Sequence, residues 1–231
     1  MIWVVVPAAG RGVRAGGVIP KQYQPVSGRP LIEHTLTALA SHPRIAGLLV
    51  VLAADDRYWP GWDMLQGKPL LTAVGGNERA ESVLAGLAGL PADVADDDFV
   101  LVHDAARPCV CAADLDALLE TQAEHGALLA TPLVDTLKRA DGDGQVLQTV
   151  PREGLWRALT PQRFRRGPLT AALRAAVADG VVVTDEAMAM ERTGAVARLV
   201  EGSPDNIKVT TAQDFERVSW LLAQRAGMEV A

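Results

Sequence analysis

A glycine-rich loop with three basic residues follows the first apolar run of the chain. Its sequence from Pro7 to Gln22 is PAAGRGVRAGGVIPKQ, which contains four glycines together with Arg11, Arg14 and Lys21. Glycine lets a backbone approach a ligand closely, and basic side chains pair with phosphate oxygens. These residues predict a site for a phosphorylated ligand directly after the first strand.

The loop differs from the two best-known phosphate-binding motifs. A P-loop requires Ser or Thr after its lysine, whereas Gln22 follows Lys21. The segment from Gly10 to Ala15 matches the dinucleotide pattern G-x-G-x-x-A, but Pro20 and two more glycines oppose the helix that should begin there. The acidic residue of that pattern is also missing at the expected distance. A long loop with added cations suits a triphosphate, or a transition state in which charge develops on a leaving pyrophosphate.

Two further polar clusters follow apolar runs. Asp104 comes directly after FVLVH at 99–103, and a carboxylate beside a triphosphate is a usual ligand of Mg²⁺. Gly75 and Gly76 either form a simple turn or let a base approach the backbone. Strand alternation points His103 away from Asp104, which favours a packed structural histidine over a catalytic base.

The elements that must position these residues alternate along the chain. Strands are expected at 2–6, 47–53, 70–74, 99–103, 127–131 and 196–201, and helices at 30–40, 78–90, 113–124, 166–178, 185–192 and from 210 or 211 onward. Asp214 completes an N-terminal capping pattern for the last helix. Strands that are apolar throughout and separated by helices predict an α/β fold with a mostly parallel sheet covered on both faces. The three polar clusters fall at the carboxyl ends of its strands, where such sheets bind ligands.

The alternation stops between residues 132 and 151. Two extended runs flank Asp141-Gly-Asp-Gly144, which is a strong signal for a hairpin turn. The segment has few large apolar residues, so we expect it to project from the core. From the residues alone it is either a surface hairpin or an arm that packs on a second subunit.

Composition limits the class of protein. The 231 residues suit a single α/β domain, and 49% of them are hydrophobic. A formal net charge of −6 argues against nucleic acid as a main partner but allows a local positive pocket. Membrane-length apolar runs and a signal-peptide pattern are both missing, so we expect a cytoplasmic protein without a membrane partner. Cys109 and Cys111 are expected to be reduced thiols and not a zinc site.

Taken together, the motifs resemble a known enzyme family. PAAGRGVR with PKQY, GGNERAESVLAGL, VHDAARP, DTLKR, TPQ, TDE and EGSPDNIKVT resemble, in this order, the 2-C-methyl-D-erythritol 4-phosphate cytidylyltransferases of the non-mevalonate isoprenoid pathway. The resemblance runs from about residue 3 to residue 215. HDAARP and DNIKVT are its most specific parts, whereas AAGxG and TPQ occur in many nucleotidyltransferases.

The resemblance implies a Rossmann-like three-layer nucleotidyltransferase fold and a reaction that converts CTP and methylerythritol phosphate, with Mg²⁺, into CDP-methylerythritol and pyrophosphate. The residues that it implies for catalysis are Arg14, Lys21, Arg152 and Lys208. Those that it implies for the nucleotide, largely through the backbone, are Ala8, Ala9, Gly10, Gly76, Ser82, Asp104 and Ala105. Those that it implies for the acceptor are Arg107, Thr136, Arg152 and Lys208, and those for the metal are Asp104 and Asp205.

The resemblance also implies a homodimer in which the 132–151 arm is exchanged, so that Thr136 and Arg152 reach the partner's site. Taken alone, Asp205 is typical of a solvated loop charge.

Two alternative functions stay open. Ribitol 5-phosphate cytidylyltransferases share most of these motifs, and the nucleotide loops cannot separate the two acceptors. A non-catalytic dinucleotide-binding module would bind NAD and would be indifferent to the loss of Asp104.

Overall fold

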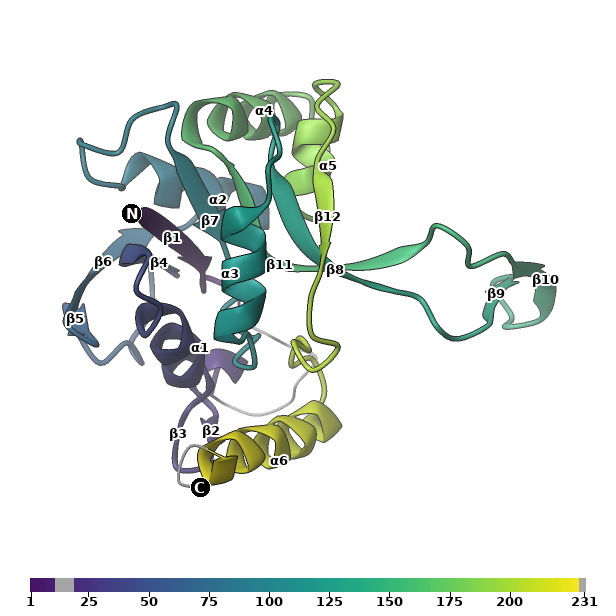
Figure 1. The fold of residues 1–231 in the computed structure, drawn as a ribbon, viewed down its shortest axis with the longest axis horizontal. Coiled ribbons are helices and arrows are strands. Elements are labelled where there is room, and N and C mark those ends of the chain that lie inside the picture. The colour runs from purple at the N-terminus through teal and green to yellow at the C-terminus, as the bar shows by residue number, and fades with distance from the viewer. Residues whose placement is uncertain (11–18, 229–231) are drawn as a thin grey trace.

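A central mixed sheet organises the chain (Figure 1). The computed structural model describes residues 1–10 and 19–228. Within these ranges the sheet has eight strands in the order β12-β8-β11-β7-β1-β4-β6-β5. The strands are β1 (Ile2–Pro7), β4 (Ile45–Leu52), β5 (Met64–Leu65), β6 (Lys68–Val74), β7 (Phe99–Val102), β8 (Ala127–Pro132), β11 (Trp156–Arg165) and β12 (Arg198–Glu201).

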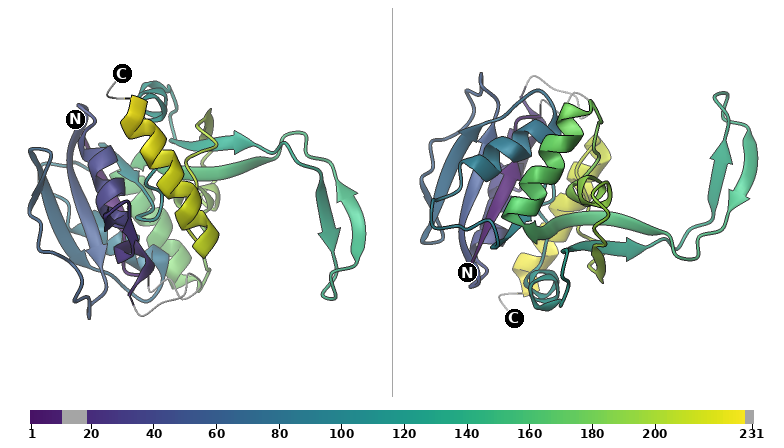
Figure 2. Two further views of the ribbon diagram at one scale, coloured as in Figure 1. Left: turned by 90° about the horizontal axis from the view of Figure 1, so that it is seen from below. Right: turned by 90° about the horizontal axis from the view of Figure 1, so that it is seen from above.

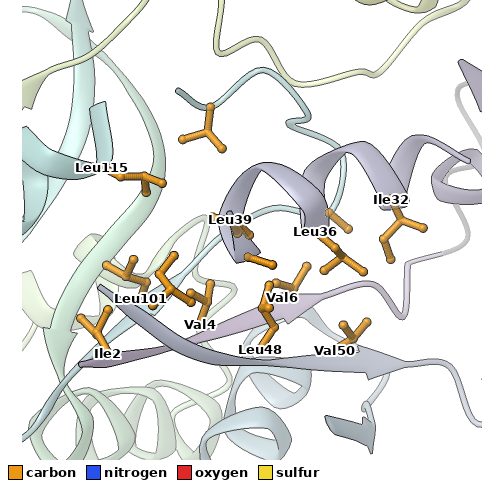
Figure 3. Packing of buried hydrophobic residues seen from close by; sticks show 14 of the residues in the cluster. Ile2, Val4, Val6, Ile32, Leu36, Leu39, Leu48, Val50, Leu101 and Leu115 are labelled. Carbon is orange, nitrogen blue, oxygen red and sulfur yellow. The ribbon is translucent and has the colours of Figure 1, made fainter. Parts of the chain in front are cut away.

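Helices cover both faces of this sheet, as Figure 2 shows from two sides. On one face lie α1 (Leu31–Ala40) and α3 (Ala112–Glu120), and on the other lie α2 (Arg79–Ala88), α4 (Arg166–Ala178) and α5 (Glu186–Glu191). Side chains of β1 alternate between the two cores. Val4 and Val6 pack with Leu36 of α1 (Figure 3), whereas Val5 packs with Val83 of α2.

The strands around the site are parallel, as the sequence predicts. Val5 of β1 pairs with Leu49 of β4 on one side and with Val102 of β7 on the other. β6 continues this arrangement beside β4, and β12 runs parallel to β8. The carboxyl ends of β1, β6 and β7 therefore meet at one edge of the sheet, where their following loops lie together.

The sequence did not predict β11, which lies antiparallel between β7 and β8. Its sequence WRALTPQRFR lacks the apolar run of the other central strands. Thr160, Gln162 and Arg163 are nevertheless buried, because each finds hydrogen-bond partners within the protein. This strand makes the sheet mostly and not entirely parallel.

The segment at 132–151 projects from the body as predicted (Figures 1 and 2). β8 and β11 continue outward as its two sides, and β9 (Leu137–Ala140) and β10 (Val146–Val150) pair antiparallel at its tip. The Asp141 side chain accepts bonds from the backbone N–H groups of Asp143 and Gln145, which closes the expected turn. Almost all of the arm is exposed.

The last helix, α6 (Ala212–Met228), packs beside the small hairpin of β2 (Pro25–Val26) and β3 (Arg29–Pro30). Asp214 Oδ2 accepts from the backbone N–H groups of Thr210 and Thr211, each at 2.8 Å, so the predicted cap is confirmed. Val218 and Leu221 of α6 bury Ile207 and Val209. Among the described residues, every helix is too short or too polar to cross a bilayer.

Candidate active site

A cavity of about 350 Å³ opens where the loops after β1, β6 and β7 meet. This size is within the usual range for small-molecule sites. The cavity brings together the following residues that the sequence singled out: Ala8, Ala9, Gly10, Lys21, Gly76, Ser82, Asp104, Ala105 and Lys208. These predicted nucleotide and catalytic residues therefore share one site. Arg14 lies outside the described residues.

Asp104 lies at the centre of a cluster of cations. Its Oδ2 is 3.0 Å from Lys208 Nζ and 3.2 Å from Arg107 Nε, and its Oδ1 is 3.3 Å from Arg79. Burial alone raises the pKa of this carboxyl, but the charges of Arg79, Lys208 and Arg107 outweigh burial and hold its pKa well below the usual range. Asp104 is therefore ionised at every pH at which the protein is expected to work.

Arg107 is nine-tenths buried and lies behind Asp104. One of its terminal nitrogens donates to the backbone carbonyl of Asn206 at 2.7 Å. Asn206 in turn donates from its side-chain nitrogen to the carbonyl of Thr160 at 2.7 Å. Arg107 thus ties Asp104 to the DNIK segment that carries Lys208, while its predicted contact with the acceptor stays a prediction.

The short 3₁₀ helix Lys21–Tyr23 joins the β1 loop to the segment after Lys208. Gln22 is buried and donates from Nε2 to the Ala8 carbonyl at 2.7 Å. Lys21 Nζ donates to the Val209 carbonyl at 2.8 Å. Lys21 and Lys208 are therefore placed around the same cavity, although they are far apart in the sequence.

The Gly75-Gly76 turn packs too closely for larger residues. A Cβ at Gly75 would lie 2.7 Å from Ser82 Oγ and 2.8 Å from the Cβ of Ala9, and one at Gly76 would lie 2.5 Å from atoms of Glu81. Contacts below 3.0 Å force neighbouring groups to move. The packing of these loops within the protein thus requires glycine at both positions, while the approach of a base to this backbone stays a prediction.

Arg79 and Glu186 are functional candidates that the residue-by-residue prediction missed. Arg79 begins α2, lines the cavity, and pairs with both Asp104 and the fully buried Glu186 of α5. Both residues lie inside motifs that carry the resemblance, GGNERAES and TDE. Membership in those motifs was the available signal, because their spacing in the chain does not indicate a contact.

His103 is a packed structural histidine, as predicted. It is completely buried; its Nε2 donates to the Arg107 carbonyl at 3.0 Å, and its Nδ1 lies 3.0 Å from Thr160 Oγ1. Because a carbonyl can only accept, the hydrogen of the neutral ring is on Nε2, and Nδ1 accepts from the hydroxyl. Burial lowers the pKa of His103 to about 4.

The predicted site residues on the arm lie away from the cavity of their own chain. Thr136 and Arg152 are both exposed, and neither lines the cavity. Arg152 donates to the Val134 carbonyl across the neck of the arm. Asp205 does not line the cavity either, and its carboxylate lies 4.0 Å from Arg217 of α6. That Thr136, Arg152 and Asp205 contribute to an active site stays a prediction.

Together, the parallel sheet edge, the glycine-containing loops and the cation cluster define a nucleotide-binding α/β enzyme of the nucleotidyltransferase class. The comparisons with known proteins identify the family. Residues 2–224 match the family model described as 2-C-methyl-D-erythritol 4-phosphate cytidylyltransferase. The chain belongs to this family.

Individual relatives agree over nearly the full length. The enzyme of this name from Stenotrophomonas maltophilia is 59% identical over 228 residues, which is 98% of both chains. The one from Xylella fastidiosa (strain M23) is 58% identical and covers 97% of this chain and 98% of its own. The crystal structure of the Francisella tularensis 2-C-methyl-D-erythritol 4-phosphate cytidylyltransferase superposes with a TM-score of 0.80 at 33% identity, covering 95% of this chain and 98% of that chain. The three-layer α/β fold expected from the sequence is confirmed.

Proposed function

We propose that the cavity is the site at which this enzyme transfers CMP from CTP to 2-C-methyl-D-erythritol 4-phosphate, in isoprenoid biosynthesis. The products are 4-diphosphocytidyl-2-C-methyl-D-erythritol and pyrophosphate. The observation that carries this assignment is the convergence of Lys21, Lys208 and Asp104 at the loops after β1 and β7, in a chain of this family. Family membership favours this reaction over the ribitol phosphate and dinucleotide-binding alternatives.

The reaction requires positioning and charge stabilisation more than proton transfer. An oxygen of the acceptor's phosphate attacks the α-phosphorus of CTP, and the bond from that phosphorus to the bridging oxygen breaks, so its electron pair leaves with pyrophosphate. The acceptor phosphate has a second pKa of about 6 and is largely dianionic at neutral pH. A general base is therefore unnecessary, which agrees with a buried His103 whose two ring nitrogens already have partners.

The cations of the cavity have distinct roles in this proposal. Lys21 lies beside the β1 loop and would stabilise charge on the α-phosphate and the leaving pyrophosphate, together with Arg14. Lys208 reaches the cavity from the segment between β12 and α6, and it would orient the acceptor phosphate. Ala8, Gly76 and their neighbouring backbone groups would hold the cytidine.

Asp104 is the carboxylate of the cavity that would bind a magnesium ion arriving with the nucleotide, in exchange for part of its contact with the neighbouring cations. Among the described residues, His, Cys, Asp and Glu form no group of three or more that could hold a metal by themselves. Mg²⁺ in phosphoryl-transfer sites commonly uses one or two carboxylates plus substrate phosphates. Asp104 would hold the ion with the triphosphate, and the ion would neutralise phosphate charge. Asp205, which lies beside Arg217, would join only after moving.

We further propose a homodimer in which each arm completes the partner's site. The arm exposes Val134, Val146 and Leu147 with between 62% and 72% of each residue accessible. An element that extends from the body with exposed apolar side chains is suited to contact a second copy. Thr136 and Arg152 would then enter the partner's cavity beside the acceptor.

A mixing experiment tests the shared site. Arg152→Ala damages the arm, and Lys208→Ala damages the body, so each homodimer should be nearly inactive. If arms are exchanged, a heterodimer holds one intact site, and random mixing should restore about a quarter of wild-type activity. Failure to restore activity, with subunit exchange verified by differently tagged chains, would place both residues in one subunit's own site.

The first assay is pyrophosphate release from CTP and Mg²⁺, with methylerythritol phosphate compared against ribitol 5-phosphate. Rapid release only with methylerythritol phosphate is expected, and Asp104→Asn should abolish it. Release only with ribitol 5-phosphate would overturn the acceptor. No pyrophosphate release with either acceptor would overturn the proposed reaction, and NAD binding would be measured next. A cytoplasmic location and the lack of a nucleic-acid or membrane partner stay predictions.

A further inference from the structure

Arg79 connects two carboxylates that belong to different layers of the molecule. Its Nη1 donates to Oε1 of Glu186, and its Nη2 donates to Oε2 of Glu186 at 3.1 Å. The same Nη2 also donates to Asp104 Oδ1 at 3.3 Å. The Arg79 side chain lines the cavity and is 25% exposed, whereas the Glu186 side chain is completely buried. Arg79, which lines the nucleotide cavity, is thus held by a carboxylate in the protein interior.

The bidentate pairing fixes the plane of the guanidinium. A guanidinium binds a carboxylate through two parallel N–H donors, which sets its orientation as well as its position. Glu186 therefore determines where the second N–H of Arg79 Nη2 points, and this N–H donates to Asp104. Without the Glu186 carboxylate, the single contact with Asp104 would be left to orient the guanidinium.

Glu186 is itself held by the two motifs that the catalytic assignment left without a role, TPQ and TDE. Gln162 of β11 accepts from the backbone N–H of Ala187 at 2.8 Å and donates to Asp185 at 2.9 Å. Asp185 caps α5 by accepting from the backbone N–H of Met188 at 2.9 Å. These bonds fix the first turn of α5, from which the Glu186 side chain extends to Arg79.

Glu186 also balances charge at the bottom of the cavity. The cluster consists of three cations and two carboxylates, namely Arg79, Arg107, Lys208, Asp104 and Glu186. Glu186 takes up the charge of Arg79, so that Asp104 does not neutralise three cations alone. One net positive charge is left, which favours binding of a triphosphate.

We propose that Glu186 is a positioning residue for CMP transfer: through Arg79 it fixes the orientation of the Asp104 carboxylate at the bottom of the nucleotide cavity. This proposal rests on the function proposed above. Its role differs from that of the residues that hold CTP, because Glu186 does not line the cavity. Loss of Glu186 should therefore affect turnover more than nucleotide affinity.

Glu186→Gln tests this role, because glutamine keeps the size of the side chain and removes its charge. We expect kcat to fall about tenfold or more, while the Kd for CTP, measured by calorimetry, changes less than about threefold. CTP affinity should be kept because the released guanidinium remains in the cavity as a cation. The matched control is Glu191→Gln, the same change at an exposed position of the same helix, which should behave as wild type.

A double-mutant cycle separates a path through Arg79 from a merely structural role. Arg79→Lys keeps the charge but offers a point donor, which cannot hold both carboxylates in the bidentate geometry. Glu186→Gln should then cause little further loss of kcat in the Arg79→Lys background. Equal losses in both backgrounds, or a Glu186→Gln enzyme with wild-type kcat, would overturn the proposal.

A fallback variant and the activity of the wild-type enzyme keep the test decisive. If Glu186→Gln does not fold, judged by thermal unfolding, Arg79→Lys alone decides: reduced kcat at unchanged CTP affinity is expected, and wild-type kcat overturns the proposal. Wild-type turnover in the same assay separates this proposal from the proposed function. The function fails if the wild-type protein is inactive, whereas the positioning role fails if the variants keep wild-type kcat.

Discussion

The Thr160 hydroxyl oxygen accepts a hydrogen bond from the backbone N–H of Asp104 at 3.0 Å. The same hydroxyl donates to His103, and the Thr160 carbonyl accepts from Asn206. One buried threonine on the antiparallel strand β11 thus joins the end of β7 to the segment that carries Lys208. The central carboxylate is positioned by its backbone from one side and by cations from the other.

Thr160→Val should therefore impair both stability and turnover. Valine has the same shape but leaves the Asp104 N–H and the His103 Nδ1 without partners, at a cost of about 1–3 kcal/mol in the free energy of unfolding. We expect a reduced kcat as well, because Asp104 loses a fixed contact. Thr160→Ser keeps the hydroxyl and serves as the control. Chemical denaturation and steady-state kinetics measure the two effects, and wild-type kcat in Thr160→Val would show that the hydroxyl does not position Asp104.

Lys21→Ala should reduce turnover far more than CTP affinity. Lys21 is held at the cavity by the Val209 carbonyl, where it can meet charge that develops as pyrophosphate leaves. Removing one such preorganised donor commonly costs about 100-fold or more in kcat. Lys68→Ala, at the opposite edge of the sheet, is the matched control. Single-turnover kinetics and CTP calorimetry provide the comparison, and equal losses in both quantities would exclude a role specific to the transition state.

Gly75→Ala should weaken CTP binding. The added methyl group would lie 2.7 Å from Ser82 Oγ and 2.8 Å from Ala9 Cβ, so the two loops must separate. Overpacking of this kind costs about 1–3 kcal/mol, and here the strain falls on residues proposed to hold the cytidine. We expect the Kd for CTP to rise about tenfold. Gly227→Ala, where nothing lies within 4 Å of an added Cβ, is the control. Unchanged CTP affinity would mean that the loops yield without affecting the site.

The sequence predicted those parts of the fold that follow from local pattern. Continuous apolar runs such as Val4–Val6 can be buried on both faces, so they indicate parallel central strands. The ends of those strands then locate Asp104 and the glycine loops. β11 escaped prediction because Gln162 and Arg163 are buried through hydrogen bonds, and hydrophobic periodicity cannot detect such partners.

The same limit applies to the site. The glycine-loop residues that line the cavity were found from motifs, whereas the pair of Arg79 and Glu186 was not. These residues are 107 positions apart, and their contact arises only because α2 and α5 lie on the same face of the sheet. Long-range ion pairs depend on topology, which residue spacing alone does not reveal.

His103 should make stability dependent on pH. Its folded pKa is about 4, whereas an unfolded histidine titrates near 6.5. Between these values the unfolded chain binds the proton and the folded chain does not, so the contribution is fully present above about pH 6.5 and is lost as the pH falls toward 4. The difference between the two pKa values corresponds to about 3 kcal/mol in the free energy of unfolding.

His103→Gln tests this linkage, because glutamine can donate to the Arg107 carbonyl and accept from Thr160 without titrating. Denaturant unfolding measured from about pH 4.5 to pH 8 should show a smaller loss of stability on acidification than in the wild type. The exposed His125→Gln is the matched control and should keep the wild-type dependence. Equal slopes in the wild type and His103→Gln would mean that other groups cause the acid sensitivity, and that the buried ring does not contribute to it.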